Sequence, residues 1–285
     1  MRNFVTWIVM HAWPFSFAHV RLLYRLKPKK MKQNVVTTRL RGFPVRLTYD
    51  PNSEIGRYLY FRGSFEEQIL NKIKQVVKSG DLVLDIGANI GVHSLVFSTL
   101  VGSSGQVVAI EPQSKVRKRL EVNLENNQID NVVVLGCAIG AEECSARIYD
   151  IAKNNDGAAT LRPSKPEKHN KFEDIEVKTL DFIEDRTGFG RFDIVKIDVE
   201  GAELEVLKGL SKLFEFRPPR CLFVECIDSN LKRFDTSSEE LIARLENFGY
   251  RLEAKNKGKW VSINNANRKN CDIYAVLNCS NSGLV

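Results

Sequence analysis

The chain has 285 residues, of which 43% are hydrophobic and 27% are charged, and its formal net charge is +7. This composition excludes collagen-like, low-complexity and wholly disordered chains, and the length suits one α/β domain with extensions or two small domains. Residues 1–49 hold ten Lys or Arg and no Asp or Glu, so the remaining residues carry 32 basic against 35 acidic side chains. A mildly acidic main body disfavours nucleic-acid binding by the whole surface.

The N-terminal segment combines aromatic and basic residues. Residues 3–20 carry no formal charge and include five Phe or Trp, and nine bases follow between Arg21 and Arg46. Eighteen residues are near the lower limit for a membrane span, and Pro14 argues against one. The pattern suits either peripheral contact with an anionic membrane surface or a helix that docks on the protein. We therefore expect a basic, aromatic-rich extension over 1–49, outside the main domain.

Beyond this extension, apolar runs predict strands that alternate with helices. Apolar residues at helical spacing begin at Phe65, and a glycine at position 80 ends that run. The expected helices cover about 65–77, 92–100, 116–124, 204–210 and 241–248. The expected strands cover about 82–86, 106–110, 132–135, 146–151, 175–180, 192–198, 221–227, 250–254 and 272–277. Such alternation predicts a doubly wound parallel sheet with ligands at the carboxyl ends of its strands.

One region interrupts this alternation. Residues 141–179 contain two expected strands that flank a long polar stretch over 153–174. Loops of this length inside a domain are usually functional, so we expect an insertion on the substrate side of a single domain over 50–285. The six cysteines form no Cys-x-x-Cys pair and have no His at zinc-finger spacing, which predicts reduced thiols in a reducing, cytoplasmic compartment.

The strongest local motif is a glycine turn after the first main strand. Asp85 closes this strand, and the segment Gly87-Ala88-Asn89-Ile90-Gly91 leads into the next helix. Glycines permit a tight turn and a ligand close to the backbone. Glu111 ends the following strand, where a carboxylate accepts hydrogen bonds from two ribose hydroxyls. The pair predicts a site for an adenosine-containing ligand, with a purely structural turn as the alternative.

The details of this turn discriminate between ligands. A dinucleotide-binding turn reads Gly-x-Gly-x-x-Gly and presents a helix N-terminus to a pyrophosphate. Here Asn89 replaces the middle glycine, the spacing differs, and Asp85 would repel a pyrophosphate. A cationic sulfonium with an amino-acid tail suits this acidic turn better. A nucleotide-dependent oxidoreductase therefore stays only as an alternative, as does a non-catalytic scaffold with the same fold.

Several stretches together resemble the FkbM-type S-adenosylmethionine-dependent methyltransferases. They are Gly63-Ser64-Phe65-Glu66, residues 80–91, Ile110-Glu111-Pro112, Asn123-Leu124, residues 179–182 and the segment Val195 to Glu203 with Val206 to Gly209. The resemblance covers roughly residues 50–280. It implies a class I methyltransferase fold, with a Rossmann-like, mostly parallel sheet of seven strands and helices on both faces. It also implies S-adenosylmethionine as cofactor and O-methylation of a hydroxyl on a sugar, a glycan or a small metabolite.

The acidic residues after the strand at 192–198 are the catalytic candidates. A hydroxyl acceptor must lose its proton during methyl transfer, and a nearby carboxylate such as Asp198 can accept it. The alternative is that Asp198 caps the helix that follows. Glu200 can orient the acceptor or help Asp198 hold a divalent ion. Carboxylates alone do not establish a metal site, and we assign no metal ligand.

Other positions are secondary candidates. Glu66 and His93 are candidates for acceptor binding, although a first-turn acid and a buried helix histidine explain them equally simply. We expect Ala138 to flank the adenine, and Asp85, Gly87, Ala88, Asn89, Gly91 and Glu111 to form the cofactor site. The acceptor is expected to be a hydroxyl-bearing small molecule or glycan, free or lipid-linked. An RNA methyltransferase stays a remote alternative because of the basic extension.

Overall fold

The computed structural model describes residues 35–150, 159–163, 171–256, 259–264 and 269–278. The expectations about the aromatic stretch and most of the basic run fall on residues 1–34 and lie outside these ranges. Within them, none of the helices is long and apolar enough to cross a bilayer. No disulfide bond joins any of the five described cysteines.

The main sheet has eight strands in the order β13-β12-β14-β11-β10-β3-β4-β5. The five strands from β11 to β5 pair in parallel, whereas β14, β12 and β13 pair antiparallel. In chain order the strands are β3 (Leu82–Ile86), β4 (Gln106–Ile110), β5 (Val132–Leu135), β10 (Ile194–Ile197), β11 (Cys221–Cys226), β12 (Tyr250–Asn256), β13 (Lys259–Ser262) and β14 (Cys271–Leu277). The class I methyltransferase architecture expected from the sequence is confirmed, with β13 as an eighth strand at one edge.

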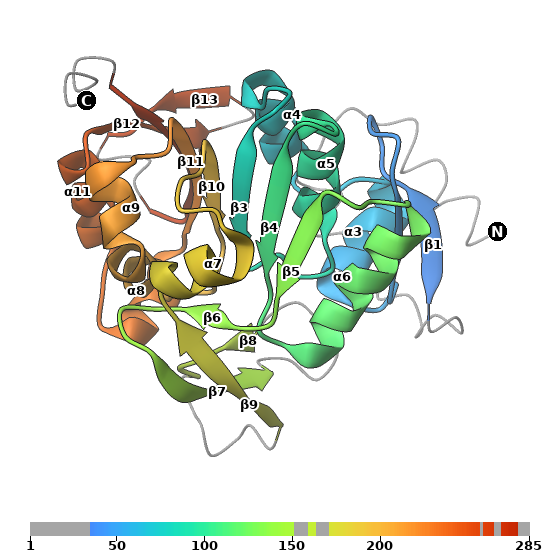
Figure 1. The fold of residues 1–285 in the computed structure, drawn as a ribbon, viewed down its shortest axis with the longest axis horizontal. Helices are drawn as coiled ribbons and strands as arrows, with labels where there is room; N and C mark the ends of the chain where they lie inside the picture. Colours follow the sequence, from blue (N-terminus) through green and yellow to red (C-terminus); the bar gives the residue numbers. More distant parts are fainter. Residues whose placement is uncertain (1–34, 151–158, 164–170, 257–258, 265–268, 279–285) are drawn as a thin grey trace.

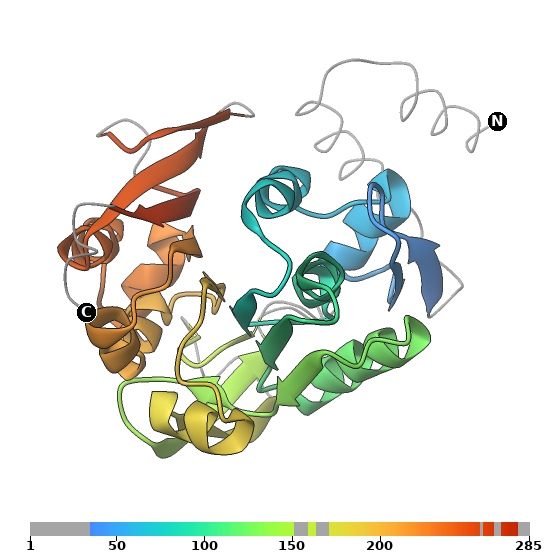
Figure 2. The ribbon, with the colours of Figure 1, turned by 45° about the horizontal axis from the view of Figure 1, so that its top comes forward.

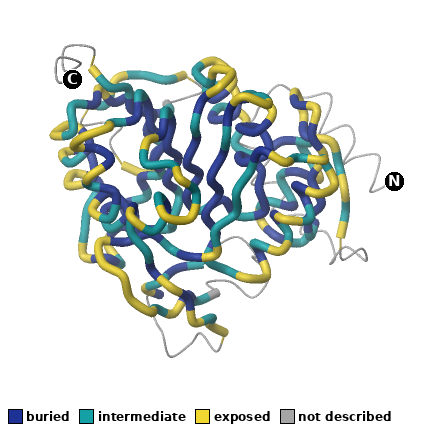
Figure 3. Tube along the Cα trace, viewed as in Figure 1, coloured by how far each residue is buried: buried dark blue, intermediate teal, exposed yellow. Residues whose placement is uncertain are grey.

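Helices cover both faces of this sheet (Figure 1). Buried residues separate into two apolar clusters, one on each side of the sheet. One cluster includes α3 (Glu54–Arg62), α4 (Glu67–Val76), α5 (Val92–Val101) and α6 (Ser114–Asn126). The other includes α7 (Leu180–Thr187), α8 (Glu203–Gly209), α9 (Ser211–Phe216) and α11 (Ser238–Asn247). The central strands are therefore buried on both sides, which is why they read as continuous apolar runs (Figure 3).

A second sheet of four strands lies beside the carboxyl end of the main sheet (Figure 1). It consists of β6 (Ala138–Ile139), β7 (Cys144–Asp150), β8 (Ala159–Thr160) and β9 (Phe172–Lys178), in the order β6-β9-β7-β8. The expected insertion over 141–179 thus supplies most of a separate small sheet. The expected strand over 175–180 ends earlier, because Leu180 opens helix α7 and turns into the apolar core.

The described part of the segment 1–49 is a hairpin that packs on the domain. Strands β1 (Val36–Arg39) and β2 (Arg46–Tyr49) pair antiparallel, at the end of the molecule opposite β12 and β13 (Figure 2). Leu40 and Leu47 are at most 1% exposed and belong to the same cluster as α4 to α6. The expected boundary after residue 49 therefore does not separate this hairpin from the domain, because buried side chains of the hairpin form part of the domain's core.

A buried asparagine ties the hairpin to the rest of the fold. Asn123 of α6 accepts a hydrogen bond from the Thr48 backbone N–H at 2.8 Å and donates to the Thr48 carbonyl at 3.2 Å. The same amide donates to the Ile90 carbonyl at 2.8 Å, next to the glycine turn. One side chain therefore links the hairpin, helix α6 and the turn that precedes α5.

We expect Asn123→Ala to lower the free energy of unfolding by about 1–3 kcal/mol, because it leaves buried backbone groups without partners. Asn126→Ala is the matched control, since the Asn126 side chain makes a single long hydrogen bond within the described residues, at 3.4 Å to the Thr48 hydroxyl. Denaturant unfolding monitored by circular dichroism measures both variants. Equal and small losses would contradict the linking role of Asn123.

Candidate active site

A cavity of about 1680 Å³ opens at the carboxyl end of the main sheet. Its walls come from the ends of β3, β4, β10 and β11, from the start of α4 and from β8 of the small sheet. The start of β14 also reaches it, because this strand runs antiparallel and its first residues lie at the same edge. Most residues predicted for the site line this cavity: Glu66, Gly87, Ala88, Asn89, His93, Glu111, Ala138, Asp198 and Glu200.

The glycine turn after β3 is shaped by a close backbone approach. Gly87 has φ of +81°, and a Cβ at this position would lie 1.8 Å from the Asp198 carbonyl oxygen. Glycine is therefore required because two strand ends meet here. Gly91 has a different surrounding: a Cβ there would lie 2.4 Å from Leu120. Gly91 faces the apolar core and is not among the cavity-lining residues, so its expected direct contact with the cofactor is not supported.

Asp85 also lies behind the cavity wall. Its side chain is fully buried, and its Oδ2 accepts a hydrogen bond from the Ser94 hydroxyl at 2.6 Å. Its Oδ1 has no hydrogen-bond partner among the described residues. Burial raises the pKa of Asp85, against the attraction of the nearby Lys196 ammonium. The carboxyl group was expected to bind the cofactor, but in the structure it does not line the cavity and instead binds Ser94 of helix α5.

Glu111 joins the end of β4 to the glycine turn. Its Oε2 accepts from the Asn89 backbone N–H at 3.0 Å, and its Oε1 accepts from the Gln113 N–H at 2.9 Å. Burial raises the pKa of this carboxyl to about 7, although both hydrogen bonds act against the shift. Each oxygen retains a second lone pair, and the side chain lines the cavity. This geometry fits a carboxylate that accepts hydrogen bonds from two ribose hydroxyls.

The most strongly charged feature is a buried ion pair at the end of β10. Lys196 is 4% exposed, and its Nζ donates to Asp198 Oδ2 at 2.8 Å. Burial opposes the charge on Lys196, but Asp198, Asp85 and Glu66 outweigh it and raise the pKa of the ammonium. The alternative that Asp198 caps the next helix is wrong. Helix α8 begins after Ala202 without a side-chain cap, and the nearby Gly201 N–H donates instead to Glu203, at 3.0 Å.

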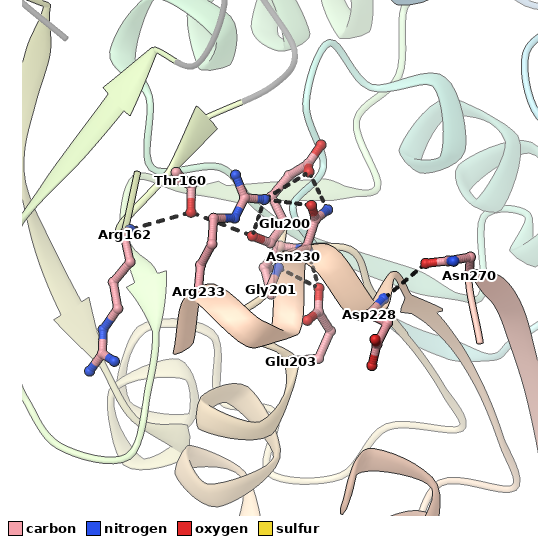
Figure 4. A network of polar contacts seen from close by, with 10 residues as sticks. Thr160, Arg162, Glu200, Gly201, Glu203, Asp228, Asn230, Arg233 and Asn270 are labelled. Carbon is pink, nitrogen blue, oxygen red and sulfur yellow. Dashed lines mark hydrogen bonds and ion pairs between the residues drawn. The ribbon is translucent and has the colours of Figure 1, made fainter. Parts of the chain in front are cut away.

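Glu200 is held in place by a polar network (Figure 4). Its Oε2 accepts from the Asn230 amide at 2.7 Å, and Arg233 donates to Asn230 Oδ1 at 2.6 Å. The Glu200 carbonyl accepts from the Thr160 hydroxyl at 3.4 Å, which connects the small sheet to the site. Burial raises the pKa of Glu200 to about 7. The carboxyl group is therefore oriented by protein contacts beside Asp198.

Glu66 and His93 form a close pair at the cavity wall. The distance from Glu66 Oε2 to His93 Nε2 is 3.3 Å, and the His93 side chain is 7% exposed. Burial raises the pKa of Glu66 to about 8 and lowers that of His93 well below its usual value. At pH 7 both groups are therefore mostly neutral, with one proton on Glu66. Glu66 also has φ of +47°, a strained backbone conformation that is often found at functional sites.

Several residues that line the cavity lie outside the cofactor and acceptor sites expected from the sequence. Ser64, Gln68 and Glu225 each have a buried polar atom without a hydrogen-bond partner among the described residues. Asp272 and Lys255 come from antiparallel strands, and their Nζ–Oδ2 distance is 2.8 Å. Ser64 belongs to the recognised segment Gly63-Ser64-Phe65-Glu66, and Glu225 lies near the end of the expected strand 221–227. The sequence therefore indicated both positions. Nothing in the sequence placed the start of β14 at this edge, because its direction depends on the tertiary fold.

The chemistry of the cavity walls fits S-adenosylmethionine. Glu111 is placed for the ribose, the apolar Ile110 and Ile139 suit the adenine, and the acidic residues around Lys196 suit a cationic ligand. Within the ranges that the structure describes, no group of three or more His, Cys, Asp or Glu side chains has an arrangement that could hold a metal ion.

Comparison with known proteins relates this chain to methyltransferases. A family model described as "Methyltransferase FkbM domain" matches residues 85–252. The chain is 28% identical over 178 residues to the hexuronic acid methyltransferase AglP of Haloferax volcanii, covering 61% of this chain and 67% of that protein. It is 27% identical over 197 residues to methyltransferase sdnD of Sordaria araneosa, covering 59% and 74% of the two chains.

Solved structures also resemble this fold. One is the S-adenosylmethionine-dependent O-methyltransferase of Thermotoga maritima, with a TM-score of 0.44 and 16% sequence identity. The match covers 86% of this chain and 78% of that one.

We expect Glu111→Ala to weaken S-adenosylmethionine binding by about 1–3 kcal/mol, because charge-assisted hydrogen bonds to the ribose are lost. Titration calorimetry measures the affinity. Glu125→Ala is the control, since Glu125 is an exposed acid on helix α6. Unchanged affinity in Glu111→Ala would contradict the ribose assignment, and a thermal-shift comparison of S-adenosylhomocysteine with NAD tests the choice of nucleotide.

Proposed function

The chain belongs to the FkbM methyltransferase family and uses S-adenosylmethionine, and from this premise we propose that it methylates a hydroxyl oxygen of a sugar, a glycan or another small metabolite. The observation that carries the proposal is the position of Asp198. Its carboxylate stands at the cavity wall with Oδ2 bound to Lys196, and among the described residues Oδ1 has no hydrogen-bond partner. A hydroxyl group next to Oδ1 would have a carboxylate ready to receive its proton.

The bound cofactor supplies an electrophilic methyl carbon on a positively charged sulfur. The protein's part is to place the acceptor oxygen in line with this carbon and to take up the proton that the hydroxyl loses. We assign proton acceptance to Asp198. Lys196 orients this carboxylate through its hydrogen bond, and Glu200, fixed by Asn230, positions the acceptor from the neighbouring turn.

Three considerations support a sugar as the acceptor class. The cavity is large enough to hold a saccharide beside the cofactor, and its walls alternate polar and apolar residues. The relative from Haloferax volcanii is named for its action on a hexuronic acid, which is a sugar derivative. The side chains near Asp198 are oxygen-rich and suit a polyhydroxylated ligand. Glu66 and His93 also line the cavity and could contact such a ligand.

We expect Asp198→Asn to lower turnover by about 10²–10⁴-fold while cofactor affinity stays nearly unchanged, which is the usual effect of losing a general base. A transfer assay with labelled methyl groups against a panel of sugars, followed by mass mapping of the product, gives turnover and the methylated position. Asp181→Asn is a matched control, because Asp181 is an exposed acid on α7 that binds Lys212. Turnover near that of the wild type would exclude Asp198 as the base, and activity that a chelator abolishes and Mg²⁺ restores would point to a metal-assisted reaction.

We also propose that the N-terminal segment brings the enzyme to a membrane-linked acceptor. Nine bases lie between Arg21 and Arg46 with no acid among them, directly after five aromatic residues. Each base near an anionic surface contributes about 1 kcal/mol, and aromatic side chains favour the headgroup level. The described hairpin keeps Arg39, Arg41 and Arg46 exposed.

This proposal predicts salt-sensitive binding to phosphatidylserine-containing vesicles by the full-length protein. Deletion of residues 1–34 should abolish vesicle binding, while thermal unfolding and S-adenosylhomocysteine affinity stay unchanged. Vesicle co-sedimentation at low and high salt measures the effect. A truncated protein that unfolds, together with a full-length protein that ignores vesicles, would show that the segment docks on the domain.

A further inference from the structure

The cavity has two ends that differ in their chemistry. Glu111 at the end of β4 and Gly87 after β3 define the cofactor end. Strands β11 and β14 lie on the other side of β10, away from β3 and β4. Neighbouring strands are about 4.8 Å apart, so the end of β11 lies roughly 10 Å from that of β3. The end formed by β10, β11 and β14 is therefore where an acceptor has room beside a bound cofactor.

At this acceptor end, Glu225 is an acidic residue whose carboxyl group is incompletely hydrogen-bonded. Its Oε2 is buried and has no hydrogen-bond partner among the described residues. In the antiparallel pairing of β11 with β14, Glu225 stands directly opposite Asp272. Like charges in this position destabilise a sheet. Lys255 compensates Asp272 through a contact of 2.8 Å, but Glu225 lacks such a partner.

The electrostatic surroundings of Glu225 disfavour further negative charge. Burial, followed by repulsion from Asp198, Glu200, Glu203 and Glu66, raises the pKa of Glu225 far above its usual value. The two lysines at this end are already bound by carboxylates, Lys196 by Asp198 and Lys255 by Asp272. A ligand carboxylate or phosphate would meet the same repulsion that keeps Glu225 protonated. A hydroxyl or ammonium group would not.

Two uncharged polar groups at the cavity wall also lack a hydrogen-bond partner among the described residues. The Ser64 side chain belongs to a residue that is 3% exposed, and its hydroxyl has no hydrogen-bond partner among the described residues. The Gln68 side-chain oxygen is buried and unpaired in the same way. Both residues line the cavity. Buried polar groups without partners are rare in folded proteins, and a ligand rich in hydroxyl groups would satisfy them.

We propose that the acceptor end selects a neutral or amino sugar over a sugar acid, because the carboxylates around Glu225 repel a further negative charge. The inference rests on the proposed function, because it concerns the acceptor of that reaction. It also separates this chain from its relative in Haloferax volcanii, which is named for a hexuronic acid. Glu225 is the position at which this preference can be altered, since it adds no step to the methyl transfer.

The test compares three probes with the same ring: methyl glucoside, glucosamine and glucuronic acid. Saturation-transfer NMR at pH 7 measures their affinities for the full-length protein saturated with S-adenosylhomocysteine. We expect glucuronic acid to bind at least about tenfold more weakly than methyl glucoside, because a charge mismatch at an interface is strongly unfavourable. Glu225→Lys should remove or reverse this difference. Glu225→Gln should keep it, because Gln and a protonated Glu have the same shape and charge.

Glu215→Lys is the matched control, since it makes the same charge change at an exposed position of α9. It should leave all three affinities unchanged. Glucuronic acid that binds as well as methyl glucoside to the wild type would overturn the inference and leave the proposed function intact. A difference that persists in Glu225→Lys would show that the charged group of the sugar does not lie near β11, and would overturn the inference. Intact cofactor binding without affinity for any of the sugars would overturn the proposed sugar acceptor, and the inference with it.

Discussion

The buried ammonium of Lys196 is the interaction on which the rest of the site depends. A charged group that is 4% exposed is stable only when carboxylates surround it. The parallel register of β10 and β3 places Lys196 beside Asp85, and the chain direction places Asp198 two residues later at the cavity wall. The Lys196 side chain thus belongs both to the buried sheet and to the wall of the cavity. Replacing Lys196 or Asp198 with a neutral residue would leave the charge of the other without its partner.

Backbone strain is concentrated around the same cavity. Four residues other than glycine that line it have a positive φ, namely Glu66, Asn89, Glu200 and Asn270. Three of them are held by hydrogen bonds: Glu111 accepts from the Asn89 N–H, Asn230 donates to Glu200, and the Asp228 N–H donates to Asn270. Such conformations are unfavourable in isolation and persist where surrounding contacts determine them. The turns after β3 and β10 therefore present their side chains in fixed orientations before any ligand binds.

Peripheral elements complete the cavity. Thr160 of the small sheet donates to the Glu200 carbonyl, and Ala138 and Ile139 of β6 form part of the cavity wall. On the other side, the hairpin β1–β2 packs on α6, whose Asn123 also binds the Ile90 carbonyl beside the glycine turn. Both additions contact the turns that carry functional residues. Both additions therefore support the site structurally.

The sequence by itself determined the central sheet, the glycine turn, the paired carboxyl groups at strand ends and the family. These features are local: an apolar run, a turn residue or a motif such as Lys196-Ile197-Asp198 carries its meaning within a few positions. Glu111 and Asp198 were found in this way because parallel strands bring their carboxyl ends to one edge.

The tertiary structure alone decided the rest. Gly91 and Asp85 face inward because of how helix α5 and strand β10 pack, which no local pattern records. The hairpin at 36–49 joined the domain through its buried alternate residues, although its composition matched a basic extension. Glu225 and Asp272 met across an antiparallel pair whose partners lie 47 positions apart in the chain. Strand direction and long-range pairing arise from the packing of the whole chain, and so the acceptor end of the cavity became visible only in three dimensions.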